Sequence, residues 1–122
     1  MSFQGILRQL LESTPGAIGA VFLDQEGEAI EVLAERVFDI GWEGLRAIGA
    51  YEGIFFSDLR RACERLSAGR PLRLSIEFEH AKVLSCALKE GYYLVLVLAP
   101  GANEGIAWQH VGHCRELLMN EL

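Results

Sequence analysis

Four acidic side chains in the first third of the chain have a spacing that could bind a divalent cation. They fall at positions 1, 3, 5 and 12 of an EF-hand-like loop: Asp24, Glu26, Glu28 and Glu35. The glycine of such a loop belongs at position 6, whereas Gly27 is at position 4. An EF-hand also needs flanking helices, and the neighbouring stretches AIGAVFL and AIEVL are of β type. The sequence therefore predicts a β-hairpin with its tip at 24–27, where Gly27 takes a positive φ and Asp24 bonds its own backbone.

A second group of reactive residues is the string HVGHC near the C-terminus. His110 and Cys114 are four residues apart on a predicted helix, where two side chains can bind one ion. Both fall within the apolar stripe of that helix, and no other cluster completes a set of four ligands. We therefore favour a core histidine beside a buried thiol over a metal site. A Cys–His nucleophile is disfavoured as well, because a reactive thiolate needs an electropositive and open setting.

Motifs that would mark a nucleotide site or a hydrolase are absent from the sequence. No phosphate loop of the form GxxxxGK[ST] occurs, and GAIG (16–19) leads into a predicted strand rather than following one. Neither a GxSxG nor an HExxH motif is present. We expect no enzymatic activity, no cofactor and no metal.

The composition indicates one globular domain over residues 1–122. Hydrophobic residues make up 51% and charged residues 23% of the chain, enough for a packed core without disulfides. The net charge of −6 argues against nucleic acid or an anionic membrane as a partner. The N-terminus lacks the features of a signal peptide, and no apolar run is long enough to span a bilayer. Because Cys63, Cys86 and Cys114 are widely spaced, we expect reduced thiols in a cytoplasmic protein.

Five segments have the pattern of β-strands. AIGAVFL (17–23) and YYLVLVLAP (92–100) are apolar without alternation, which is typical of adjacent central strands covered on both faces. EAIEVLAE (28–35) alternates weakly and is expected nearer an edge. LRLSIEF (72–78) alternates cleanly, and short polar connections join it, AKVLSCALK (81–89) and the last strand into an antiparallel meander. In 72–78 the inward residues are expected to be Leu72, Leu74, Ile76 and Phe78, and the outward ones Arg73, Ser75 and Glu77.

A helix is expected at each end of the chain. Ser2 can cap the first helix, and Thr14-Pro15-Gly16 ends it. Its apolar stripe consists of Phe3, Ile6, Leu7, Leu10 and Leu11. Asn103 can cap the last helix. The inward residues of that helix are expected to be Ile106, Ala107, Val111, Cys114, Leu117 and Leu118.

The segment from Asp39 to about Ser67 has the pattern of a long helix with a wide apolar face. Its apolar side chains spread over half of the circumference or more: Trp42, Leu45, Ile48, Tyr51, Ile54, Phe55, Phe56, Leu59, Ala62, Cys63 and Leu66. Gly49 and Gly53 lie one turn apart, and each costs up to about 1 kcal/mol relative to alanine. Glu52 projects near the middle of the apolar face, where a carboxylate needs a partner. Either the glycines bring the helix close to its own sheet or kink it, or a helix of a second subunit approaches there. Whether they divide the segment into two helices also stays open.

These elements follow one another in the order α-β-β-α-β-β-β-α. A five-stranded antiparallel sheet with two fully apolar strands must be covered on both faces. We predict an α/β (α+β) three-layer sandwich, with the long helix on one face of the sheet and the two terminal helices on the other.

Three strings give the chain a resemblance to the roadblock (dynein light chain roadblock) family, which includes bacterial gliding-motility regulators of small Ras-like GTPases. They are PGAIGAVFLDQEGEAI (15–30), the long helix after Asp39, and GYYLVLVLAPGANEGIAWQHVGHCRELL (91–118). The resemblance covers nearly the whole chain. The aromatic string YEGIFFSDL (51–59) departs from it, since many family members carry small residues there.

The resemblance implies a non-catalytic homodimer that binds a Ras-like small GTPase as a scaffold or regulator and biases its nucleotide state or location. In this family the long helices pair across a two-fold axis, the adjacent edge strands can join two sheets, and the paired helices offer a docking surface. By position on the matching helix, the expected interface residues are Trp42, Leu45, Ile48, Gly49, Tyr51, Glu52, Gly53 and Phe55. On its more polar side, Arg46, Arg61 and Arg65 would either contact an acidic partner or form a solvated helix face.

Two other functions remain as alternatives. One is a small-molecule sensor in which His110, Cys114 and Tyr93 line a pocket between the sheet and its helices. The other is a metal-dependent enzyme built on His110, His113 and Cys114.

Overall fold

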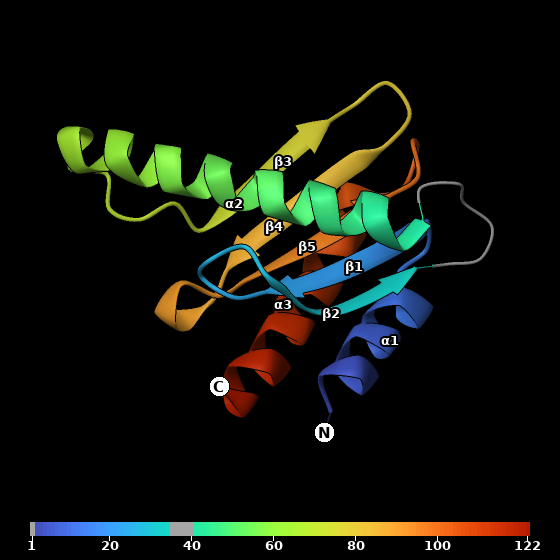
Figure 1. The fold of residues 1–122 in the computed structure, drawn as a ribbon. Coiled ribbons are helices and arrows are strands. Elements are labelled where there is room, and N and C mark those ends of the chain that lie inside the picture. Colours follow the sequence, from blue (N-terminus) through green and yellow to red (C-terminus); the bar gives the residue numbers. More distant parts are fainter. Residues whose placement is uncertain (1, 35–40) are drawn as a thin grey trace.

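An antiparallel sheet forms the middle layer of the computed structural model, which describes residues 2–34 and 41–122 and the side chains of 2–34 and 44–122. The elements are α1 (Phe3–Ser13), β1 (Ala17–Leu23), β2 (Ala29–Ala34), α2 (Gly41–Leu66), β3 (Arg73–Glu77), β4 (Lys82–Ala87), the 3₁₀ turn η1 (Lys89–Gly91), β5 (Tyr93–Leu98) and α3 (Glu104–Glu121). The strands lie in the order β2-β1-β5-β4-β3. Figure 1 shows α2 crossing one face of the sheet, with α1 and α3 on the other. The predicted element order and three-layer sandwich are confirmed.

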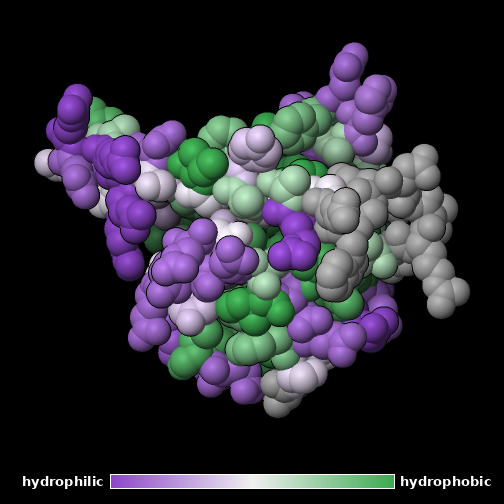
Figure 2. Space-filling model, in the orientation of Figure 1, coloured by the Kyte–Doolittle hydropathy of each residue, from purple (hydrophilic) through white to green (hydrophobic). Residues whose placement is uncertain are grey.

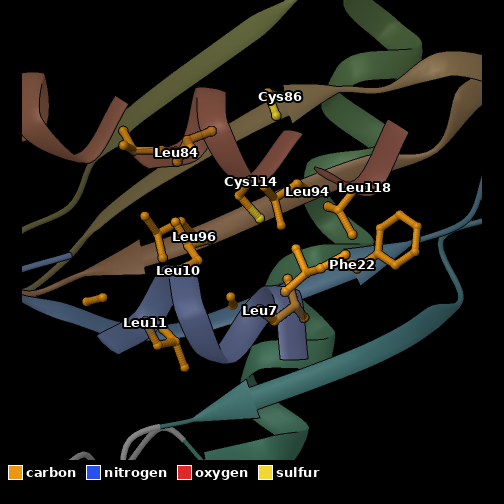
Figure 3. Close-up of a cluster of buried hydrophobic side chains, with 14 of the residues drawn as sticks. Leu7, Leu10, Leu11, Phe22, Leu84, Cys86, Leu94, Leu96, Cys114 and Leu118 are labelled. Atoms are coloured by element: carbon orange, nitrogen blue, oxygen red, sulfur yellow. The ribbon is translucent and has the colours of Figure 1, made fainter. Parts of the chain in front are cut away.

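The face under α1 and α3 carries one of two hydrophobic cores. Eight buried side chains come from the two helices: Ile6, Leu7, Leu10, Leu11, Ala107, Val111, Cys114 and Leu118. They pack on alternate residues of the three strands below them, such as Phe22, Leu84 and Leu96 (Figure 3). Both helices are capped as predicted, because Ser2 Oγ accepts a hydrogen bond from the Gly5 amide at 3.0 Å and Asn103 Oδ1 accepts one from the Ile106 amide at 2.9 Å.

The prediction that Ile106 points inward is wrong, because 41% of its surface is exposed. Ala107, the next residue, is fully buried and takes the inward position in the first turn of α3. Since neighbouring residues on a helix are about 100° apart, both cannot face the sheet equally.

The face under α2 carries the second core. It is built from the other alternate residues of β1 and β5, among them Val21, Leu23, Val95 and Val97, together with Leu45 of α2. Every residue of β1 and β5 is buried, and the two strands are hydrogen-bonded neighbours. The prediction of two adjacent central strands is therefore confirmed, as is the edge position of β2.

The acidic segment between β1 and β2 forms the predicted turn. Asp24 Oδ1 accepts hydrogen bonds from the Glu26 amide at 2.9 Å and the Glu28 amide at 3.0 Å. Gly27 has a φ of +84°, a conformation that glycine adopts without strain. The carboxylate of Asp24 thus holds the turn together, while Glu35 lies outside the described residues.

Helix α2 is one continuous helix from Gly41 to Leu66, so Gly49 and Gly53 do not divide it. It packs chiefly on β2 and β1, at one side of the sheet. Asp39, where the helix was expected to begin, lies outside the described residues.

The inward direction predicted for the two ends of the 72–78 segment is wrong. Leu72 is 62% and Phe78 is 51% exposed, and both lie just outside β3. Leu74 and Ile76, between them, are half-buried. The predicted alternation along the strand is correct, because Ser75 and Arg73 point to the other face of the sheet, where they contact α3. Ser75 donates a hydrogen bond to Glu104, and the Arg73 guanidinium lies 4.7 Å from the centre of the Trp108 ring. The ends are exposed because β3 is one edge strand of the sheet, whereas α2 packs mainly on β1 and β2, near the opposite edge.

Candidate functional site

The inner face of α2 lies very close to the sheet of its own chain. A Cβ atom added to Gly49 would be 2.9 Å from Leu23 Cδ2, and one added to Gly53 would overlap the hydroxyl of Tyr93. Leu45, one turn earlier, is fully buried on the same face. The two glycines therefore let the helix backbone rest directly on side chains of β1 and β5.

Tyr93 uses the space that the glycines leave. Its hydroxyl donates a hydrogen bond to the Gly49 carbonyl at 2.9 Å, inside the helix. Its ring lies 6.0 Å from that of Phe56, which is also on α2. Burial, and then the nearby charges of Asp24 and Glu52, raise the pKa of Tyr93 to about 12. The phenol therefore stays protonated and keeps this hydrogen bond over the physiological pH range.

Glu52 is the buried carboxyl group of this helix, with 2% of its surface exposed. Ser85 of β4, itself fully buried, donates a hydrogen bond of 2.6 Å to Glu52 Oε2. Burial raises the pKa of Glu52, and the hydrogen bond from Ser85 lowers it in part. The partner that a carboxyl group needs at this position is thus a serine of the same chain. Sequence reasoning missed Ser85, although a lone hydroxyl in the apolar strand KVLSCA was a usable signal.

These contacts place four of the predicted interface residues on the inner face of α2. Leu45, Gly49, Glu52 and Gly53 were assigned to a subunit interface, but in the structure they face the sheet of their own chain. Of the two explanations for the glycines, close packing on the protein's own sheet is the one that the structure bears out. The surface of α2 that remains for a partner is the opposite one.

The outer face of α2 carries large apolar side chains that the described chain covers only in part. We call them the outer stripe, with their exposed fractions: Tyr51 (64%), Ile54 (54%), Phe55 (43%), Leu59 (38%) and Leu66 (75%). Their spacing of three, four and seven residues places them along one side of the helix. Figure 2 shows hydrophobic side chains along the course of α2, with hydrophilic ones at its projecting end. A contiguous exposed apolar surface of this kind marks an interaction site more often than a scattered one does.

The other predicted interface residues lie around this stripe. Ile48 is half-buried against the core under α2, and Arg46, Arg61 and Arg65 are exposed. Trp42 belongs to the first turn of α2, but its side chain lies outside the described residues.

The histidines and cysteines of the last helix do not converge on a site. Cys114 is buried in the core under α1 and α3, where burial raises its pKa and that of Cys86 to about 12. These thiols are therefore protonated and poor nucleophiles. His110 is half-buried near Cys114 rather than in the core, and His113 is exposed. Within the described residues, no group of three or more His, Cys, Asp and Glu side chains could hold a metal ion.

The pocket expected for a sensor is not formed by the three residues assigned to it. His110 and Cys114 border a space of about 10 Å³ between α1 and α3. Tyr93 packs on the opposite face of the sheet, in the core under α2. The sensor interpretation is therefore wrong in its choice of residues.

Comparison with known proteins yields matches in structure but none in sequence. No family model and no curated protein matches the chain. Two MglB structures, one with a tetrameric arrangement and one of the gliding protein from Thermus thermophilus, each have a TM-score of 0.86 at 19% identity. Those matches span 97% of this chain and 85% and 86% of the MglB chains. A Roadblock/LC7 domain from Streptomyces avermitilis has a TM-score of 0.84 at 14% identity, over 97% of this chain and 95% of that one.

The chain has the roadblock fold. At such low identities the likeness shows the fold alone, so the resemblance drawn from the sequence is confirmed at that level. Within the described residues, none of the helices combines the length and the hydrophobicity that spanning a membrane requires.

Proposed function

We propose that this roadblock domain is a non-catalytic cytoplasmic homodimer that serves as a scaffold or regulator of a Ras-like small GTPase. The observation that carries the proposal is the outer stripe. Its side chains lie on a helix whose other face is already packed on the sheet, and much of their apolar surface is exposed in the described chain. The resemblance of the sequence to GTPase regulators supplies the class of partner, and the shared fold supports it.

Self-association through this face requires a surface that is complementary to itself. The outer stripe supplies apolar area, and exposed residues of both charges flank it, including Arg61, Arg65, Asp58 and Glu64. Each copy can therefore offer both signs of charge to the other. We include Trp42 and Ile48 at the start of the helix, and β2 as the neighbouring edge strand. That an MglB of the same fold has a tetrameric arrangement supports self-association.

The partner would be regulated by contact rather than by chemistry supplied from this chain. A surface shifts the nucleotide state of a GTPase only if it binds one state of the switch regions more tightly than the other. The exposed arginines Arg46, Arg61 and Arg65 would then meet an acidic surface of the GTPase.

The first test is the solution mass of the wild type and of Tyr51→Asp, measured by light scattering after gel filtration across micromolar concentrations. Tyr51 is the most exposed aromatic residue of the outer stripe. An aspartate there places a charge in the apolar interface, so the wild-type dimer should dissociate. Gln109→Asp adds the same charge at an exposed position of α3 and should leave the mass unchanged. A wild type that is monomeric throughout this range would refute the homodimer.

The second test is binding to a Ras-like GTPase loaded with GDP or with a non-hydrolysable GTP analogue. The dimer should bind one nucleotide state at least about tenfold more tightly, or change the hydrolysis or exchange rate by a similar factor. If neither form is bound and neither rate changes, the regulatory role fails while the dimer can still stand.

A further inference from the structure

A cavity of about 270 Å³ lies beside the 3₁₀ turn η1, at the end of the sheet where β4 passes into β5. Its walls come from the middle of α2, the connection between α2 and β3, η1, and the last turns of α3. None of the five outer-stripe residues lines it. The cavity is therefore separate from the surface proposed for self-association, and its volume is just below the usual range for small-molecule sites.

Basic side chains converge on this cavity from four different elements. Arg60 comes from α2, Arg70 from the connection to β3, Lys89 from η1 and Arg115 from α3, and Glu90 is the one acidic residue of the lining. These are four of the eleven lysines and arginines of a chain whose net charge is −6. Like charges gathered around a concave surface raise the local concentration of anions.

The position of one of these cations is set by the fold. Arg115 is half-buried, and its Nε donates a hydrogen bond of 3.2 Å to the Ala87 carbonyl at the end of β4. That bond uses one of the five N–H groups of the guanidinium and holds the plane of the group in place. Arginine binds carboxylate and phosphate oxygens through paired hydrogen bonds.

Aromatic side chains form another part of the lining. Phe56 and Tyr93 both line the cavity, with their rings 6.0 Å apart. The hydroxyl of Tyr93 is already bonded to Gly49, so its ring cannot turn away. Tyr92, also in the lining, is stacked at 5.8 Å on the buried ring of Phe22. Such a wall suits the apolar or aromatic body of a small molecule.

We propose that this cavity binds a small organic anion, whose carboxylate or phosphate group is held by Arg60, Arg70 and Arg115 and whose body packs on Phe56 and Tyr93. The basic residues of the lining select the charged group, and its aromatic residues select the apolar body. The site is independent of the dimer, so Tyr51→Asp should not weaken it.

Benzoate and phenyl phosphate are suitable probes, because each joins one oxyanion to one ring; inorganic phosphate and the neutral benzamide each lack one part. Binding is measured by calorimetry and by chemical shifts of the backbone amides of Lys89, Glu90 and Gly91. Benzoate or phenyl phosphate should bind at millimolar concentration or below and shift these amides. Inorganic phosphate and benzamide should each bind at least about tenfold more weakly. Whichever of the two anionic probes binds more tightly shows whether the cavity prefers a carboxylate or a phosphate.

The variants Arg60→Gln and Arg70→Gln remove exposed cations that make no described hydrogen bond within the fold. Each should weaken probe binding by roughly tenfold. Arg8→Gln is the matched control, because Arg8 is an exposed arginine of α1 that does not line the cavity, and it should leave probe binding unchanged. The proposal is overturned if none of the anions shifts the amides of η1 at 10 mM, as a rough ceiling for a specific site. Equal losses in Arg60→Gln and Arg8→Gln would overturn it too, because they would indicate an effect of surface charge alone. Benzamide binding as tightly as benzoate would also overturn it.

Discussion

The two faces of the sheet are covered in different ways. On one face, α1 and α3 bury eight hydrophobic side chains. On the other, α2 is 26 residues long, yet among its described residues Leu45 is the one buried hydrophobic side chain. On the first face, helix side chains pack against strand side chains. On the second, the helix packs largely through its backbone at two glycines and through one hydrogen-bonded carboxyl group. One layer is thus completed within the described chain, while the other leaves apolar side chains of α2 exposed.

The largest effect on stability is expected when a mutation creates a cavity in the core under α1 and α3. Leu118 is fully buried between α3 and the sheet, so Leu118→Ala should lower the free energy of unfolding by about 2–5 kcal/mol. Leu59→Ala, at a 38% exposed position of α2, should change it by less than about 0.5 kcal/mol. Both are measured by urea unfolding in the Tyr51→Asp background, so that loss of the proposed dimer does not contribute. Equal losses at the two positions would contradict the comparison.

A smaller effect, but one with an informative sign, is expected at the glycines. Gly53→Ala forces a Cβ against the hydroxyl of Tyr93 and should destabilise the chain by about 1–3 kcal/mol, although alanine is the better helix former. Gly112 lies in α3 with no atom within 4 Å of an added Cβ. Gly112→Ala should therefore stabilise the chain by up to about 1 kcal/mol. A stabilising Gly53→Ala, measured by the same urea titration, would show that α2 does not rest on its glycines.

The smallest effect concerns the pH dependence of stability. Because burial raises the pKa of Glu52 above its ordinary 4.5, the folded state holds this proton more tightly than the unfolded state does. The stabilisation that this bound proton gives the folded state is fully present below the ordinary pKa. It is lost as the pH rises through the raised pKa of Glu52 in the folded state. Glu52→Gln keeps the carbonyl that accepts from Ser85 and cannot ionise. Relative to the wild type, it should therefore gain stability between pH 4 and pH 7.5.

The measurement is the difference in unfolding free energy between wild type and Glu52→Gln at these two pH values, since other titrating groups cancel in that difference. Ser85→Ala is the companion variant and should destabilise the chain at both pH values, because it leaves the buried carboxyl group without its donor. A constant difference between wild type and Glu52→Gln would mean that Glu52 ionises normally.

Periodicity and turn chemistry predicted most of the fold. The uninterrupted apolar runs identified β1 and β5 as central, and Asp24 and Gly27 identified the first turn. What failed is informative. Leu72 and Phe78 alternate correctly but are exposed, because periodicity shows which side chains share a face and not whether anything covers that face.

The candidate site was predicted only in part, because periodicity does not show what covers each face of α2. The wide apolar arc of α2 was correctly recognised, but its division into an inner and an outer face depends on where the sheet lies. Gly49 and Gly53 fitted two explanations equally well until Leu23 and Tyr93 were seen beneath them. The basic cavity could not be foreseen, because Arg60, Arg70 and Arg115 come from segments far apart in the sequence.

The way α2 rests on the sheet also affects how the protein can diverge. Its inner contacts are made by the buried side chain of Leu45, by backbone at Gly49 and Gly53 and by one carboxyl–hydroxyl pair, so the distance between the helix and the sheet does not depend on the outer side chains. Residues such as Tyr51, Ile54 and Phe55 can therefore be exchanged without disturbing a contact in the core. The outer surface of the domain can thus evolve at little risk to its folding.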